Sequence, residues 1–250
     1  MNLLPSGKRF TQLSLPRDIT FGYGPKDLSA HLIKCLPMLS PLRIADIGSG
    51  ISLHAIELAK TYPRATVRAF EPSVDMQILS RENIAISKQQ NILFSDIGVE
   101  QVSTDYPSHF DFIHTCLIKY FVGSESSFEK NIISSMAKNS IWICTDFFIP
   151  ESYPNPLRAV AFELMKEIFG FEIMNSDQFI NTVAALGLKL IDDSDVVKGE
   201  RSTASMSGFS KVNDHRKYLL SEICRRKFLP EDFVSLQGAM PVRTFAFVRE

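Results

Sequence analysis

A short stretch near the start of the chain combines an acidic side chain with two closely spaced glycines. Its polar and glycine residues are Asp46, Gly48, Ser49 and Gly50. The apolar run Leu42 to Ile47 predicts a buried strand, and apolar residues recur with helical spacing over Ser52 to Thr61. Glycine is favoured where the backbone approaches a ligand closely, and the free N–H groups at the start of a helix attract polar ligand groups. The strand, turn and helix therefore predict a nucleotide-type binding site in an α/β sheet.

Two acidic residues follow the next two predicted strands. Ala65 to Phe70 predicts the second strand, and Glu71 comes directly after it, 21 residues beyond Gly50. A carboxylate at this point can accept hydrogen bonds from both hydroxyls of a ribose, which NAD and other adenosine cofactors share. Asn91 to Phe94 predicts the third strand, and Asp96 follows it. Three motifs thus follow three successive strands.

The glycine turn excludes two common nucleotide motifs. The sixth position of the dinucleotide fingerprint, counted from Gly48, is Leu53 instead of glycine, and no phosphate loop ending in Gly-Lys-Ser/Thr occurs. The acidic residue and spaced glycines instead resemble the first motif of the class I S-adenosylmethionine-dependent methyltransferases of the small-molecule type. Ser52 stands where these enzymes often carry a third glycine. Together with Glu71 and Asp96, the resemblance extends over most of the chain, from about residue 26 to residue 250.

The resemblance implies S-adenosyl-L-methionine as cofactor and a set of residues that contact it. In the family, the acidic residue after the third strand accepts from the adenine amino group, and the next apolar residue packs on the ring. An aromatic residue of the leading arm covers the methionine end, although packing in a turn is an equally good interpretation of Tyr23. The implied cofactor-binding residues are Tyr23, Asp46, Gly48, Ser49, Gly50, Glu71, Pro72, Met76, Asp96, Ile97 and Cys116.

The catalytic base is a separate question, which arises if the methyl acceptor is a hydroxyl. His114, in the predicted fourth strand Phe110 to Cys116, is the nearest candidate by motif position, and a structural role is the alternative for a lone histidine in a strand. Further candidates are His54, Asp146 and Lys119. The five histidines are dispersed without a His-x-x-x-His pair, so we expect no metal site.

The resemblance implies one α/β domain over residues 1–250, with a Rossmann-like, doubly wound sheet. We expect seven mostly parallel strands with an antiparallel last strand, an N-terminal arm or lid at 1–25, and substrate-cap insertions at 150–175 and 198–237. The remaining predicted elements are helices over Lys26–Leu36, Val74–Lys88, Glu125–Ala137, Leu157–Phe169 and Phe179–Leu186, and strands over Ser140–Phe147, Lys189–Ile191 and Val242–Val248.

Composition restricts the class of protein and its partners. The 250 residues are 45% hydrophobic and carry a formal net charge of −1, which favours neither nucleic acid nor an anionic membrane as partner. The four cysteines are scattered and contain no Cys-x-x-Cys pair, which is typical of a cytoplasmic protein. The fourth strand lacks the Asn/Asp-Pro-Pro-aromatic motif of base-amine methyltransferases. We therefore expect a small-molecule acceptor, while the oligomeric state, a homodimer included, stays open.

Three alternatives remain beside methyl transfer to a small molecule. The chain could bind S-adenosylmethionine and catalyse a reaction other than methylation, as some natural-product cyclases with this fold do. It could be a catalytically inactive, cofactor-binding partner subunit, because Ser52 departs from the glycine pattern and no base is obvious. A nicotinamide dehydrogenase is disfavoured by Leu53.

Overall fold

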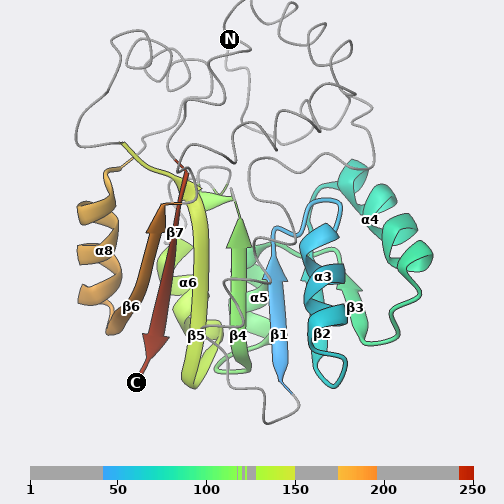
Figure 1. The fold of residues 1–250 in the computed structure, drawn as a ribbon, viewed down its shortest axis with the longest axis horizontal. Helices are drawn as coiled ribbons and strands as arrows, with labels where there is room; N and C mark the ends of the chain where they lie inside the picture. Colours follow the sequence, from blue (N-terminus) through green and yellow to red (C-terminus); the bar gives the residue numbers. More distant parts are fainter. Residues whose placement is uncertain (1–41, 117, 120–121, 123–127, 150–173, 196–241) are drawn as a thin grey trace, which may run out of the picture.

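The computed structural model describes residues 42–116, 118–119, 122, 128–149, 174–195 and 242–250. They form a seven-stranded sheet with helices along it (Figure 1). The strands are β1 (Arg43–Ile47), β2 (Thr66–Phe70), β3 (Ile92–Ser95), β4 (Phe110–Cys116), β5 (Met136–Phe147), β6 (Leu188–Asp195) and β7 (Val242–Arg249). The helices are α3 (Leu53–Thr61), α4 (Val74–Ser87), α5 (Val99–Asp105), α6 (Phe128–Ser135) and α8 (Ser176–Ala185).

The strand order, β3-β2-β1-β4-β5-β7-β6, confirms the predicted doubly wound sheet. β1 pairs in parallel with both β2 and β4, and β7 runs antiparallel between β5 and β6. The chain winds outward from β1 to β3, and then restarts at β4 on the other side of β1. This reversal creates a switch point at the carboxyl ends of β1 and β4, which is where open α/β sheets bind ligands.

Two apolar cores lie on the two faces of the sheet. Because successive side chains of a strand alternate between faces, Ile44 and Phe112 pack with α3, whereas Ala45 and Ile113 belong to the core with α5 and α6. Figure 1 shows α3 and α4 in front of the sheet and α5 and α6 behind it. Coverage on both faces explains why the central strands bury apolar side chains on both sides of the sheet.

The sequence predictions miss three features of this fold. Helix α5 was not expected, because only Val99 and Val102 of its seven residues are buried. β5 begins at Met136 and so ends α6 at Ser135, since Met136 pairs with Phe110 ahead of a shift in register. The third feature is β6, which continues to Asp195 because it stays paired with β7. All three differences arise from pairing or packing with distant parts of the chain.

Several expectations fall outside the described residues. The N-terminal arm, Tyr23 and most of the two cap insertions (150–175 and 198–237) belong to this group, as do the helices expected over Lys26–Leu36 and Leu157–Phe169. They stay predictions. Among the described residues, no helix is long and apolar enough to cross a bilayer.

Helix α8 begins with a capping box formed by Asn175 and Gln178. The side chain of Asn175 accepts from the N–H of Gln178 at 2.8 Å, and the Gln178 side chain accepts from the N–H of Asn175 at 3.1 Å. We expect Asn175→Ala to lower the free energy of unfolding by about 1 kcal/mol, measured by urea denaturation, because the N–H of Gln178 loses its side-chain acceptor. Asn175→Asp keeps an acceptor and should match the wild type. Equal stability of the alanine variant would show that the cap contributes nothing.

Candidate functional site

The glycine turn after β1 takes a left-handed backbone at three positions. Gly48 and Gly50 have φ of 71° and 54°, and Ser52 has φ of 61°. The left-handed region favours glycine, so Ser52 holds the conformation that a third glycine would take more easily. The Ser52 side chain is buried and its hydroxyl contacts those of Ser49 and Ser80. Ser52 therefore departs from the glycine pattern but keeps the left-handed backbone that a glycine would have there.

The two glycines face different surroundings. A Cβ on Gly48 would lie 2.3 Å from Cγ2 of Ile118, so the chain after β4 packs directly against this position. A Cβ on Gly50 would meet no described atom within 4 Å. The N–H groups of Gly48 and Ser49 both donate to the carbonyl of Phe70 at 2.9 Å, which ties the turn to the end of β2. The turn is thus anchored at Gly48 and open at Gly50.

Glu71, at the end of β2, holds the turn from the other side. One carboxylate oxygen accepts from the N–H of Gly50 and the other from the N–H of Ser73, each at 2.8 Å. Burial raises the pKa of Glu71 to about 7, the two N–H donors oppose this shift, and the nearby charge of Asp46 adds to it. Each oxygen keeps a second lone pair that can accept from a ligand. Glu71, which is predicted to bind the ribose, therefore also holds the turn in place.

The remaining predicted cofactor residues lie along the same edge. Asp96 is exposed directly after β3, and Ile97 is half-buried against the core. Pro72 is exposed between β2 and α4, and Met76 is half-buried near the start of α4. The N–H of Glu71 donates to the carbonyl of Ser95 at 3.1 Å, so the ends of β2 and β3 stay adjacent. The motifs of three strands thus share one edge of the sheet.

Two polar residues form a buried pair between β1 and β4. Asp46 and His114 occupy paired positions of the two strands and are 1% and 0% exposed. Nδ1 of His114 lies 2.7 Å from Oδ1 of Asp46. Because a carboxylate only accepts, the ring proton is assigned to Nδ1, which leaves a lone pair on Nε2 in the neutral ring. Within the described part of the chain, His114 Nε2 and Asp46 Oδ2 have no hydrogen-bond partner.

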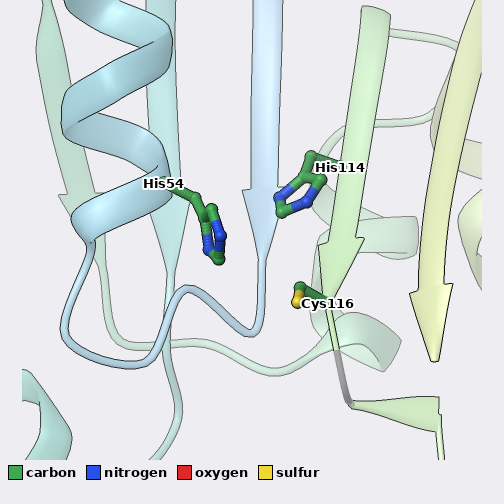
Figure 2. A group of neighbouring side chains, drawn as sticks. All are labelled: His54, His114 and Cys116. Atoms are coloured by element: carbon green, nitrogen blue, oxygen red, sulfur yellow. The ribbon is translucent and has the colours of Figure 1, made fainter. Parts of the chain in front are cut away.

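His54 and Cys116 adjoin this pair. The rings of His54 and His114 are 4.9 Å apart between centroids, and Cys116 lies two residues beyond His114 on the same face of β4. Figure 2 shows the side chains of His54, His114 and Cys116 directed towards one another from α3 and β4. Burial raises the pKa of the Cys116 thiol well above its ordinary value. The sequence alone does not show this grouping, because His54 of α3 meets His114 and Cys116 of β4 only in the folded protein.

The other two candidate bases are held in a different set of contacts. The ammonium of Lys119 pairs with Glu129, and the N–H of Lys119 donates to a carboxylate oxygen of Asp146 at 3.0 Å. Asp146 is 1% exposed. The ion pair and the hydrogen bond favour a structural role for Lys119 and Asp146 at the ends of β4 and β5.

Several solved structures have the same architecture as this chain. A phosphoethanolamine N-methyltransferase 2 of Haemonchus contortus, with S-adenosylhomocysteine and phosphomonomethylethanolamine bound, matches 89% of the chain at 15% identity with a TM-score of 0.64. The match covers 52% of that enzyme, so the chain spans about half its length. A putative sarcosine dimethylglycine methyltransferase of Galdieria sulphuraria matches 90% of the chain and 85% of its own at 13% identity, with a TM-score of 0.66.

A third match is the geranyl diphosphate C-methyltransferase of Streptomyces coelicolor A3(2), in complex with S-adenosylhomocysteine. It covers 90% of the chain and 79% of its own at 10% identity, with a TM-score of 0.64. The chain has the fold of the class I methyltransferases. At these identities the match shows the methyltransferase fold alone. No protein-family model matches the chain, and no curated protein matches its sequence.

Proposed function

We propose that the protein is an S-adenosylmethionine-dependent methyltransferase that acts on a small-molecule acceptor in the cytoplasm. The observation that carries the proposal is the shared edge of the sheet, where the open glycine turn, Glu71 and Asp96 follow three adjacent strands. Structural neighbours that bind S-adenosylhomocysteine together with small substrates support it. The sheet edge is also the switch point at which this class of fold binds nucleotides.

The described residues offer groups whose chemistry suits the cofactor. Glu71 has lone pairs for ribose hydroxyls beside the open space at Gly50, and exposed Asp96 can accept from an adenine amino group. Ile97, Met76 and Pro72 supply apolar contact area around such a ring. The methionine end would lie at the glycine turn, near Asp46 and Cys116. Each of these roles is a proposal.

Bound S-adenosylmethionine would supply an activated methyl group for in-line displacement at carbon, with S-adenosylhomocysteine as the leaving group. The protein contributes alignment of acceptor and methyl carbon, which is the main term for such a reaction. For a hydroxyl acceptor we propose that Nε2 of His114 takes the proton, while Asp46 holds the ring by its Nδ1–H. Asp46 is then a positioning residue and also balances the imidazolium charge.

A calorimetric titration of the purified protein with S-adenosylhomocysteine tests the cofactor, with NADH as the control ligand. Micromolar binding of S-adenosylhomocysteine alone supports the proposal. Binding of NADH alone would refute it and favour a dehydrogenase. No binding of either ligand would also refute it.

The role of His114 predicts a defect in turnover and not in cofactor binding. With a hydroxyl acceptor found by mass spectrometry, His114→Gln should lower kcat by about a hundredfold or more, the usual contribution of a general base. The affinity for S-adenosylhomocysteine should stay near that of the wild type. His109→Gln, which changes a histidine at the opposite end of β4, is the matched control. Wild-type kcat in the His114 variant would leave this residue a structural role only.

One neighbour favours a second function. The [4+2]-cyclase SpnF matches 93% of the chain and 84% of its own at 13% identity, with a TM-score of 0.65. The same site could therefore serve a reaction without methyl transfer, and an inactive partner subunit is the further alternative. Product mass decides among them, since methylation adds one methylene unit to the acceptor and an inactive subunit gives no product.

A further inference from the structure

We propose that His54, His114 and Cys116 form a binding site for a divalent transition-metal ion, with Zn²⁺ as the best fit. One ligand atom from each of these residues can be chosen so that all three lie within 4.8 Å of one another. Two imidazoles and one thiolate are the donor types that Zn²⁺ prefers, and three protein ligands leave a fourth position for water or a substrate group. This site goes beyond the proposed function and does not rest on it.

The environment of His114 is the strongest sign of a ligand. Its Nε2 is fully buried and has no hydrogen-bond partner among the described residues, and Nδ1 is held by Asp46 at 2.7 Å. A histidine that ligates a metal usually donates its other ring N–H to a carboxylate, which fixes the tautomer and makes the ligating nitrogen more basic. Asp46 and His114 have this arrangement. A buried nitrogen without a partner is otherwise costly.

The charges in the cluster also balance around a dication. Asp46 is 1% exposed and its Oδ2 has no hydrogen-bond partner within the described part of the chain. When the ion binds, Cys116 loses its proton to solvent and becomes a thiolate. The two negative charges of this thiolate and the Asp46 carboxylate then neutralise a divalent cation, so the loaded site buries no net charge.

The geometry requires only small side-chain movements. Zn²⁺ bonds of about 2.0–2.3 Å set neighbouring ligand atoms about 3.5 Å apart, compared with a spread of up to 4.8 Å here. Figure 2 shows the three side chains converging from the first turn of α3 and the end of β4. Cys116 is half-buried. A metal on Nε2 occupies the lone pair that proton transfer needs, so the metal-loaded and base roles of His114 exclude each other.

The test is a titration of the chelator-treated, full-length protein with Co²⁺, without any cofactor present. We expect one ion per chain, with d–d bands of tetrahedral Co²⁺ and a thiolate-to-cobalt charge-transfer band, both removed by excess Zn²⁺. Cys116→Ser should abolish the charge-transfer band, whereas Cys144→Ala, which changes the buried cysteine on β5, should keep it. Asp46→Asn should weaken binding by about 10- to 100-fold.

Two results would overturn the site. One is the absence of stoichiometric Co²⁺ binding by the wild type, which would leave Asp46 and His114 as a buried packing pair. The other is a charge-transfer band that persists in Cys116→Ser, because the thiolate would then come from another cysteine. Circular dichroism of each variant shows that it is folded. Since no cofactor is used, failure here does not bear on S-adenosylhomocysteine binding.

Discussion

Valine in place of Gly50 is expected to abolish binding of S-adenosylhomocysteine while the fold stays in place. A side chain at Gly50 projects into space that no described atom occupies within 4 Å, so we expect it to meet the ligand. The N–H of Gly50 remains available to Glu71. The left-handed φ of 54° adds a cost of about 1–2 kcal/mol for a residue with a side chain. Calorimetry measures the affinity, and thermal unfolding measures the stability.

Gly187→Val is the matched control for backbone strain. Gly187 also has a positive φ, 91°, and no described atom within 4 Å of its Cβ position, but it lies between α8 and β6, away from the glycine turn. Both variants should lose similar stability, and only the Gly50 variant should lose the ligand. Equal affinity of the two variants for S-adenosylhomocysteine would mean that the glycine turn is not the binding site.

Gly48→Val should also lose binding, by a different route. Its Cβ would lie 2.3 Å from the side chain of Ile118, so the chain after β4 has to move. We therefore expect a larger loss of stability than for the Gly50 variant. The stability of the two variants therefore distinguishes a turn that a side chain blocks, as in Gly50→Val, from a turn that is displaced, as in Gly48→Val.

The central strands and the motifs at their ends could be predicted from the sequence, because the signal is local. A strand covered by helices on both faces is rich in apolar residues, such as Ile44, Ala45 and Ile47 of β1, and a glycine or acidic residue that follows it is then conspicuous. The alternation of strands and helices predicts the mostly parallel order, the family resemblance implies the antiparallel β7, and both are confirmed.

The grouping of Asp46 and His114 with His54 and Cys116 could not be predicted from the sequence, because it depends on contacts between distant segments. Asp46 and His114 meet only when β1 pairs with β4 in one register, 68 residues apart in the chain. The extension of β6 has the same cause, since Asp193 pairs with Arg243 of β7 at 2.7 Å. Dispersed histidines in a sequence therefore do not exclude a cluster in the fold.

Glu71→Ala is expected to weaken binding of S-adenosylhomocysteine by about 1–3 kcal/mol, the scale for losing charge-assisted hydrogen bonds. The carboxylate both faces the expected ribose position and holds the N–H of Gly50. Calorimetry measures the affinity of the Glu71→Ala variant. The same measurement on Asp96→Asn, which removes one charge at the end of β3, compares the contributions of the two carboxylates. Unchanged affinity in a folded Glu71 variant would remove this residue from the cofactor site.

The pKa of Glu71 makes its structural role visible as a dependence on pH. Burial raises the pKa from 4.5 to about 7 in the folded protein. The stability that the protonated group contributes is complete below about pH 4.5, and it is lost as pH rises through about 7. The shift corresponds to a contribution on the order of 3 kcal/mol. The difference in unfolding free energy between wild type and Glu71→Gln should therefore decrease by up to this amount from pH 5 to pH 8.

The same proton should act on affinity in the opposite direction. Ribose hydroxyls donate to an ionised carboxylate more strongly than to a protonated one, so S-adenosylhomocysteine should bind the wild type more tightly at pH 8 than at pH 6. Glu71→Gln, which has no titrating group, should lose this dependence. If Glu71 only held the turn, the fold would still become less stable at higher pH, but affinity would not rise. Opposite trends in stability and affinity therefore separate a ligand-binding Glu71 from a structural one.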